Sequence, residues 1–312
     1  MTVPTAVQRL AIVAWGDHPC PPTHLRDQLS DLDCDVVVRD VTDLDDCDAA
    51  VTVYHHEEFI GSVDWVHTIR SGYDDFPLDA YEEQGITLTN STGIAGDLVA
   101  ETALGLMLTQ AKGLHRYRDK QRDADWERIP WQRPFELGSE SVCVVGLGAL
   151  GSSVATRAAA LGMDVWGVDV RPVAALGLDR VYDVARIQTA VENARFVVLT
   201  APLMESTRGL VSTAELAAMR EDAFLVNVSR GEIVDQPALE AALRGEEIAG
   251  AALDVFATEP LADESPLWEM ENVVVTPHAA AQSNNYGEKV ATLVRTNARI
   301  LDTDRDPWNR IV

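Results

Sequence analysis

The sequence predicts an α/β protein with two doubly wound domains, each built on a parallel sheet. The chain has 312 residues, enough for two domains of ordinary size. Short apolar runs alternate with helix-like segments over the first hundred residues, and a second alternation of the same kind starts at Ser141. The runs are separated by roughly 15–25 residues, which is the spacing that helical crossovers between parallel strands require.

The first alternation predicts five strands and one long helix. The helix is expected from Gly96 to about Gln121, because apolar and long side chains recur there at spacings of three and four. A connector with two prolines is expected from Trp126 to Glu140. The five runs that predict strands are Leu10–Trp15, Asp35–Val38, Ala49–Tyr54, Trp65–Ile69 and Ile86–Leu88.

The second alternation predicts a larger sheet. Its apolar runs are continuous, as in parallel strands that are buried on both faces. The six runs are Val142–Val145, Val165–Val168, Phe196–Leu199, Phe224–Val228, Ala251–Leu253 and Val273–Thr276. Helices are predicted between most of them and after the last, at Leu150–Leu161, Thr213–Ala218, Pro237–Arg244 and about Tyr286–Leu301.

The charge of the chain is unusual. Fifty acidic residues against 25 basic ones give a net charge of −25, and only three of the basic residues are lysines. Nucleic acids and anionic membranes require a basic surface, so the composition argues against both as partners. A dense run of aspartates from Asp31 to Asp48 predicts a solvated acidic face. Since salt at about 1 M screens such repulsion within about 3 Å, the composition indicates a halophilic protein of a salty cytoplasm.

The four cysteines show neither a C-x-x-C pair nor a histidine at metal-ligand spacing. We therefore expect free thiols in a reducing compartment and no metal site. The N-terminus has only a short apolar run, and no stretch of 18 apolar residues occurs. These features predict a cytoplasmic protein without a signal peptide or a membrane span.

Gly146, Gly148 and Gly151 form the pattern G-x-G-x-x-G directly after an apolar run and directly before a helical stretch. In a dinucleotide site the first glycine permits a tight turn and the second lets the backbone approach a pyrophosphate. The third allows the helix to pack closely on the strand. The helix N-terminus, with Ala149 and Leu150, then presents its N–H groups to the phosphates. The pattern predicts a dinucleotide-binding loop.

Asp169 and Arg171 bear on the identity of the cofactor. Asp169 ends the next apolar run, where a carboxylate can accept hydrogen bonds from the adenosine ribose. That carboxylate repels a 2′-phosphate, whereas Arg171 can attract one. A solvent-facing Arg171 without contact to the cofactor is the alternative. The pair predicts a nicotinamide cofactor and leaves the choice between NAD(H) and NADP(H) open.

Three further candidates follow later apolar runs, at the sheet edge where ligands bind in open α/β folds. Arg230 carries a planar guanidinium that can bind a carboxylate with two hydrogen bonds, although a structural ion pair is an equal alternative. Glu259 and His278 come after the next two runs. A histidine in this position, with an arginine and a glutamate placed similarly upstream, suggests proton transfer.

Together these residues resemble the D-isomer-specific 2-hydroxyacid dehydrogenases, relatives of D-lactate, glyoxylate/hydroxypyruvate, phosphoglycerate and formate dehydrogenases. The resemblance covers nearly the whole chain, and its motifs occur in the order of the family. Besides the glycine loop they are Ser71–Asp74, Val99–Glu101, Thr200–Leu203, Asn227–Gly231, Asp254–Pro260 and Thr276–Ala280.

The resemblance implies reversible NAD(P)H-dependent reduction of a 2-oxo acid to the D-2-hydroxy acid. Arg230 would bind the substrate's carboxylate and carbonyl, and His278 would be the proton donor. Glu259 would pair with His278 and keep it charged and oriented. The resemblance also implies that the cofactor would contact Thr200, Pro202 and Asp254. The substrate would contact Ser71, Gly72 and Tyr54.

Two positions depart from the family pattern. Ser71-Gly72-Tyr73 stands where Ala-Gly-Val or a similar sequence is usual, and Thr102 stands where a histidine often follows the helix glutamate. Tyr54 and Tyr73 lie near the family's substrate contacts and suggest a partly apolar pocket.

The resemblance also implies how the domains are arranged. The Rossmann-type nucleotide-binding domain would span 101–285 and would be inserted into a substrate domain made of 1–100 and 286–312. The active site would lie between them, and the long helix from Gly96 would join two copies in a homodimer.

Two alternatives stay open at this stage. Some family members are NAD(H)-sensing corepressors, whose output is a protein contact rather than a reaction. Within the enzymes, specificity of the phosphoglycerate or hydroxypyruvate type is possible. Formate dehydrogenase is disfavoured, because Glu259 stands where those enzymes carry glutamine.

Overall fold

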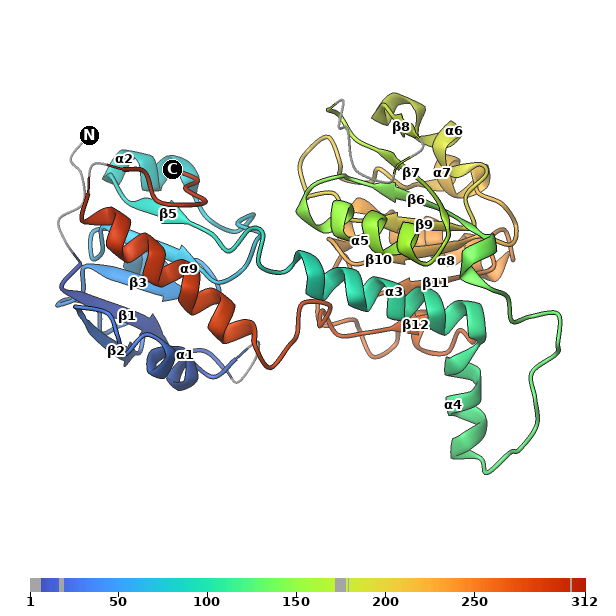
Figure 1. The fold of residues 1–312 in the computed structure, drawn as a ribbon, viewed down its shortest axis with the longest axis horizontal. Coiled ribbons are helices and arrows are strands. Elements are labelled where there is room, and N and C mark those ends of the chain that lie inside the picture. The colour runs from blue at the N-terminus through green and yellow to red at the C-terminus, as the bar shows by residue number, and fades with distance from the viewer. Residues whose placement is uncertain (1–6, 17–19, 172–177, 179, 304) are drawn as a thin grey trace. The chain divides into compact units, whose positions relative to one another are not determined.

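The computed structural model describes residues 7–16, 20–171, 178, 180–303 and 305–312. The chain divides into two compact units (Figure 1). The first consists of Met1–Ala95 and Gln282–Val312, and the second of Gly96–Ala281. The second unit is therefore an insertion in the sequence of the first.

The first unit contains a sheet of five parallel strands in the order β2-β1-β3-β4-β5. All five predicted strands are confirmed, with ends shifted by one or two residues. Their bounds are β1 Arg9–Val13, β2 Asp35–Arg39, β3 Ala49–Thr52, β4 Trp65–Thr68 and β5 Thr87–Thr89. Because all the strands are parallel, the chain leaves the sheet at one edge after each of them.

Helices cover both faces of this sheet. Ala11 and Val13 of β1 belong to a core that includes Phe59 and Tyr81. Side chains alternate along a strand, so Leu10 and its neighbour two residues on face the opposite side, where α1 packs against α9. The helices are α1 Pro22–Gln28, α2 Leu78–Gln84, α9 Tyr286–Leu301 and the short 3₁₀ helix η1 Glu57–Phe59.

The second unit contains seven parallel strands in the order β12-β11-β10-β9-β6-β7-β8. Its first strand, β6, lies inside the sheet. The chain then adds β7 and β8 on one side of β6 and β9 to β12 on the other. This is the strand order of the Rossmann fold, and its switch point lies between β6 and β9. The bounds are β6 Ser141–Val145, β7 Asp164–Val168, β8 Arg180–Tyr182, β9 Phe196–Leu199, β10 Phe224–Asn227, β11 Gly250–Leu253 and β12 Val273–Val275.

Six of these strands are predicted by the sequence, and β8 is not. It is three residues long, lies at the edge of the sheet and has no buried residue. No apolar run marks such a strand, since its outer side needs no apolar cover.

The prediction of one continuous helix from Gly96 to Gln121 is wrong. The structure contains α3 Gly96–Lys112 and α4 Leu114–Arg122, which meet at Gly113. Gly113 has a φ of 63°, in the left-handed region that ends helices. A Cβ there would lie 2.5 Å from Ile129 Cδ1. Local periodicity continues through this position, but the backbone of Gly113 changes direction.

The remaining helices of the second unit agree with the predicted segments or connect them. They are α5 Ala149–Ala160, α6 Ile187–Val191, α7 Thr213–Ala218 and α8 Gln236–Arg244, with the short 3₁₀ helices η2 Leu137–Ser139, η3 Val184–Arg186, η4 Gly231–Ile233 and η5 Pro266–Trp268. Among the residues that the structure describes, no helix has the length and apolar character needed to cross a bilayer.

Candidate active site

The glycine loop connects β6 to α5, next to the switch point of the sheet. Gly146 has a φ of 93°, and a Cβ there would lie 2.6 Å from backbone atoms of Ala201. A Cβ at Gly151 would lie 1.8 Å from the Gly146 carbonyl oxygen. Thr200 Oγ1 donates to that same oxygen at 2.6 Å. Glycine is therefore required at both positions by the packing of the loop on its own neighbours.

Gly148 differs from the other two glycines. A Cβ at this position would meet nothing within 4 Å, so the backbone faces open space. Gly148 is also the N-cap of α5, and no side chain caps this helix N-terminus. An uncapped N-terminus beside open space suits the pyrophosphate of a dinucleotide. The residues present thus fit the cofactor that the sequence predicts, with Ala149 and Leu150 in the first turn of α5.

Asp169 follows β7 directly and is buried. Its Oδ2 accepts a hydrogen bond from Leu147 N–H of the glycine loop at 2.8 Å, and its Oδ1 accepts one from Arg171 N–H at 2.9 Å. Burial alone would raise the pKa of Asp169, but the hydrogen bonds and the charge of Arg171 outweigh it and lower that pKa. Arg171 Nε lies 3.2 Å from Oδ1, and its side chain remains 65% exposed. The carboxylate stays ionised at the end of β7.

Asp254 lies just beyond β11 and is fully buried. Its Oδ1 accepts from Ala279 N–H and its Oδ2 from Ala280 N–H, both at 2.9 Å. Thr276 Oγ1 donates to Oδ1 at 2.5 Å. In addition, His278 N–H donates to the Asp254 carbonyl oxygen at 2.7 Å. Asp254 therefore determines the path of the segment that carries His278, a role that sequence reasoning missed.

His278 and Glu259 are joined by a side-chain hydrogen bond. His278 Nδ1 lies 2.7 Å from Glu259 Oε2, and Glu259 Oε1 accepts from Phe256 N–H at 3.0 Å. Burial by itself raises the pKa of Glu259, but the hydrogen bonds from His278 and Phe256 and the charges of His278 and Arg230 lower it overall. Glu259 is thus an ionised carboxylate held against the imidazole ring of His278.

Arg230 belongs to the loop after β10. Asn227 Nδ2 donates to the Arg230 carbonyl oxygen at 3.0 Å, and Arg230 Nη1 donates to the Ser229 carbonyl oxygen at 2.8 Å. A Cβ at Gly231 would lie 1.8 Å from the Phe256 carbonyl carbon, so the loop packs directly on the segment that leads to Glu259. The positive charge of Arg230 acts on Glu259. The structure thus brings Arg230, Glu259 and His278 to the same edge of the second sheet.

The loop role of Asn227 is a second contribution that the sequence analysis did not assign. Its Oδ1 accepts from Ser229 N–H at 3.1 Å, which forms a local side-chain turn. An asparagine directly after a buried run is the signal that could have revealed this turn. Of the other predicted cofactor contacts, Thr200 is buried against the glycine loop, whereas Pro202 is exposed.

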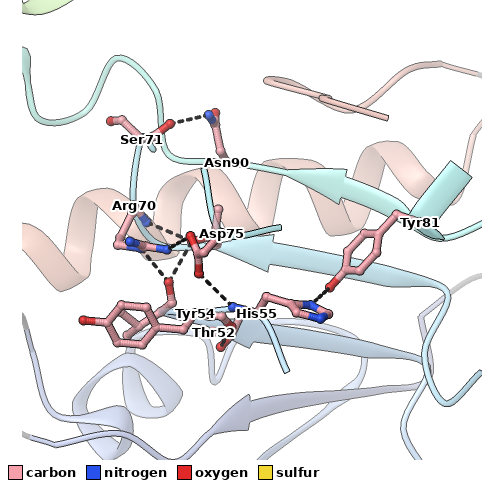
Figure 2. Close-up of polar contacts among 10 residues, drawn as sticks. Thr52, Tyr54, His55, Arg70, Ser71, Asp75, Tyr81 and Asn90 are labelled. Carbon is pink, nitrogen blue, oxygen red and sulfur yellow. Dashed lines mark hydrogen bonds and ion pairs between the residues drawn. The ribbon is translucent and has the colours of Figure 1, made fainter. Parts of the chain in front are cut away.

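The predicted substrate residues Tyr54, Ser71 and Gly72 belong to the first unit. They lie after β3 and β4, at the carboxyl edge of the first sheet (Figure 2). Asn90 Nδ2 donates to the Ser71 carbonyl oxygen at 2.7 Å, and Gly72 is half-exposed. The Tyr54 side chain is 57% exposed. These residues are accessible and lie at the edge where α/β sheets bind ligands.

The geometry of the second unit first defines a class of protein. A glycine loop at the switch point of a Rossmann sheet binds a dinucleotide, and a histidine at the same edge of the sheet can transfer a proton. Both features are typical of nicotinamide-dependent dehydrogenases. The family model described as "D-isomer specific 2-hydroxyacid dehydrogenase, NAD binding domain" matches residues 104–280, and the chain belongs to this family. It is therefore an oxidoreductase of 2-hydroxy acids that uses NAD(H) or NADP(H).

Similar proteins agree with this assignment. Glyoxylate reductase of Korarchaeum cryptofilum is 32% identical over 283 residues, which cover 89% of this chain and 83% of the relative. D-3-phosphoglycerate dehydrogenase of Methanocaldococcus jannaschii is 34% identical over 227 residues, 72% of this chain and 42% of the relative.

Solved structures extend the similarity to the whole fold. The TT0316 protein from Thermus thermophilus is 26% identical with a TM-score of 0.84, covering 98% of this chain and 100% of that one. The NADPH-dependent glyoxylate/hydroxypyruvate reductase of Sinorhizobium meliloti, in complex with citrate, is 25% identical with a TM-score of 0.85. It covers 98% of both chains.

Proposed function

We propose that this enzyme reversibly reduces a 2-oxo acid to the D-2-hydroxy acid, with His278 as the general acid and base. The observation that carries the proposal is the 2.7 Å pair between His278 Nδ1 and Glu259 Oε2, on a segment that Asp254 positions. Since Nδ1 is engaged by Glu259, Nε2 is the nitrogen that can exchange a proton with the substrate. In the direction of oxidation, His278 accepts the proton and acts as the general base.

Each side chain has a defined task in this proposal. When bound, the nicotinamide supplies the hydride chemistry. Arg230 binds the carboxylate and polarises the carbonyl, because its planar fork matches carboxylate geometry. His278 donates a proton to the carbonyl oxygen, a contribution of typically about 10²–10⁴-fold in rate. Glu259 fixes the tautomer and the orientation of the ring.

For the cofactor, we propose that the loop from Gly146 to Gly151 binds the pyrophosphate and that Asp169 accepts from the adenosine ribose. Arg171, exposed beside Asp169, would contact a 2′-phosphate. Thr200, Pro202 and Asp254 would line the nicotinamide end. The uncapped N-terminus of α5 and the open space at Gly148 support this assignment.

The substrates that we propose first are small 2-oxo acids such as glyoxylate and hydroxypyruvate. The similarity to a glyoxylate reductase over 89% of this chain supports them. Specificity for a phosphorylated acid, as the similarity to a D-3-phosphoglycerate dehydrogenase would suggest, is the competing assignment.

The test is the loss of absorbance at 340 nm with NADH and with NADPH, measured against a panel of 2-oxo acids. We expect turnover with several members of the panel. Tight binding of NADH without turnover of any acid would contradict the proposal and would favour the NAD(H)-sensing corepressor type.

We also propose a homodimer formed through α4 and the segment after it. The residues of α4 are all at least partly exposed, and Trp126 and Trp131 are 100% and 84% exposed. Exposed tryptophans of this size mark protein interfaces. Light scattering should give twice the mass of the chain, and Trp131→Ser should raise the monomer fraction at low concentration.

For the cellular environment of the enzyme, we propose a reducing cytoplasm of high ionic strength. All four cysteines are free thiols. The aspartates from Asp31 to Asp46 are exposed, and although several of them pair with arginines, the segment keeps an excess of negative charge that salt would screen. A melting temperature that does not rise with KCl concentration would contradict the second part of this proposal.

A further inference from the structure

The second unit contains a cavity of about 330 Å³ that is separate from the candidate active site. Part of its lining comes from the starts of four neighbouring strands: Arg195 directly precedes β9, Phe224 begins β10, Ala249 directly precedes β11, and Asn272 directly precedes β12. Since all four strands are parallel, these residues lie at the amino edge of the sheet. The candidate active site lies at the carboxyl edge, at the other ends of the strands. The volume is at the small end of the range of ligand sites, about 300–1,000 Å³.

The junction of α3 with α4 and the segment after α4 form the rest of the wall. At this junction the chain changes direction, as Figure 1 shows. Phe135 N–H donates to the Ala111 carbonyl oxygen at 3.0 Å, and Lys112 Nζ donates to the Phe135 carbonyl oxygen at 2.6 Å. Gln110 Nε2 donates to the Ala251 carbonyl oxygen at 2.7 Å, which joins α3 to β11. The wall of the cavity is therefore held by contacts within the second unit.

The charged residues that line the cavity are basic. Arg116 comes from the first turn of α4, Arg133 from the segment after it, and Arg195 from the edge of the sheet. Among the described residues of the lining, none is an aspartate or a glutamate. The chain as a whole has 50 acidic and 25 basic residues, so a lining of this composition is unusual for it. A concave surface lined by one sign of charge attracts ions of the other sign.

Arg195 is only partly neutralised by its acidic neighbours. Its Nη1 forms an ion pair with Asp222, but Arg220 pairs with the same carboxylate, so one negative charge serves two guanidinium groups. Glu140 adds a negative charge that acts on Arg195. The Arg195 side chain is only 12% exposed, and its Nε is buried without a hydrogen-bond partner among the described residues. A charged donor in this state favours an acceptor in the adjoining cavity.

The other two arginines are held less firmly by acidic partners. Arg116 Nη1 lies 3.7 Å from Glu271 Oε2, and the Glu271 side chain is 87% exposed, so the pair is weak. Arg133 is exposed and forms no ion pair with the residues that the structure describes. The planar guanidinium group matches both carboxylate and phosphate with two parallel hydrogen bonds. Arg116 and Arg133 are therefore suited to bind acid groups of a ligand.

We propose that this cavity is a second anion site, which binds a small molecule with two or more phosphate or carboxylate groups. Arg116 and Arg133 bind the acid groups, and Arg195 supplies a further positive charge from the edge of the sheet. The bound anion joins α4 and the segment after it to the starts of the strands. It contacts neither the cofactor nor the 2-oxo acid, so the site is independent of the reaction that the enzyme performs.

The experiment titrates the NADH-saturated enzyme with pyrophosphate and with citrate in a calorimeter, at one KCl concentration. NADH fills the dinucleotide site, so the remaining heat reports other anion sites. We expect saturable binding of at least one of the two anions, together with a higher melting temperature. Arg116→Gln and Arg133→Gln should each raise the Kd about tenfold, the scale of one hydrogen bond to a charged group. Binding of pyrophosphate alone would indicate a phosphorylated ligand, and binding of citrate alone a polycarboxylate.

Two further variants serve as controls. Arg122→Gln removes the same charge from the same helix, at a position outside the lining, and should leave the Kd for the anion unchanged. Arg230→Lys changes the candidate active site and should also leave it unchanged. Thermal melts of each variant without added anion report whether it is folded.

Three results would overturn the proposal. If Arg230→Lys weakens binding and Arg133→Gln does not, the anion binds at the candidate active site. If Arg122→Gln weakens binding as much as Arg133→Gln, the effect is one of overall charge. If the wild type binds neither anion, and Arg133→Gln raises the monomer fraction in light scattering, a carboxylate of a second copy fills the cavity instead. Absence of binding without any change of mass also contradicts the site.

Discussion

The loops at the two sheet edges of this molecule differ in several of the hydrogen bonds that hold them. In the second unit, carboxylates accept from backbone N–H groups: Asp169 from Leu147, Asp254 from Ala279, and Glu259 from Phe256. In the first unit, side-chain donors engage backbone carbonyls: Arg70 with Val53, Asn90 with Ser71, and Tyr286 with Ile69. In these bonds the second unit uses side-chain carboxylates as acceptors, whereas the first unit uses side-chain donors.

This difference has a consequence for function. The reacting groups and the cofactor require the same geometry with every substrate, and the second unit fixes it with glycines and buried carboxylates. The loop of the first unit, to which we assign the substrate contacts, depends on side chains such as Arg70 and Asp75. We expect substitutions of the reacting groups and of the glycine loop in the second unit to weaken catalysis or cofactor binding, and those in the loop after β4 to change specificity.

The largest effect is expected at the glycine loop. Gly151→Ala places a Cβ 1.8 Å from the Gly146 carbonyl oxygen, a backbone atom, and should lower the free energy of unfolding by about 3 kcal/mol or more. Gly148→Ala is the matched variant, because its Cβ meets nothing. It should unfold like the wild type but raise the Kd for NADH about tenfold, since the methyl group enters the pyrophosphate space. Thermal melts and fluorescence titrations measure both quantities.

If Gly148→Ala instead binds NADH normally, the open space at Gly148 is not the pyrophosphate site. A stable Gly151→Ala protein would show that the loop can move away from α5, and the contrast between the two units would weaken.

The next effect concerns Arg230. Arg230→Lys keeps the charge but loses the bidentate fork, so KM for the 2-oxo acid should rise about tenfold to hundredfold. Steady-state kinetics with saturating cofactor measures it. A lysine variant that works as well as the wild type would make Arg230 a structural residue. The carboxylate would then be bound elsewhere.

A smaller effect is expected from the pH dependence of stability. The pKa of Glu259 is lowered in the folded protein, so the stabilisation from its bonds is present above the ordinary carboxyl value of about 4.3. It is lost as the pH falls through the lowered, folded-state pKa. The difference in unfolding free energy between wild type and Glu259→Gln should therefore be constant at neutral pH and shrink in acid. Denaturant melts from pH 7 down to about pH 3 would show it; a difference that grows in acid would contradict the direction of the shift.

The smallest effect is expected for Arg171. It pairs with Asp169 but is 65% exposed, and exposed charge pairs are worth little. Arg171→Ala should lower the ratio of kcat/KM for NADPH to that for NADH by about two- to fivefold at fixed ionic strength. An unchanged ratio would mean that Arg171 does not contact the 2′-phosphate.

The sequence predicts the features that depend on local patterns. Apolar runs reveal both sheets, and the glycine spacing reveals the loop after β6. Gly113 shows the limit of periodicity, because one left-handed residue divides a helix whose apolar pattern continues. The side-chain network of the first unit is not predictable in this way: Tyr286 lies 217 residues from Ile69 along the chain. Asp254 illustrates the same limit. The sequence shows that it belongs to a family motif, but its hydrogen bonds to Ala279 and Ala280 depend on the fold.

The central claim is that His278, oriented by Glu259, transfers the proton. The most direct test is kcat of His278→Ala for reduction of a 2-oxo acid, together with its Kd for NADH. The account predicts a kcat lower by about 100-fold or more, with the Kd unchanged, because the imidazole takes part in proton transfer and not in cofactor binding. A variant with near wild-type kcat would contradict the claim.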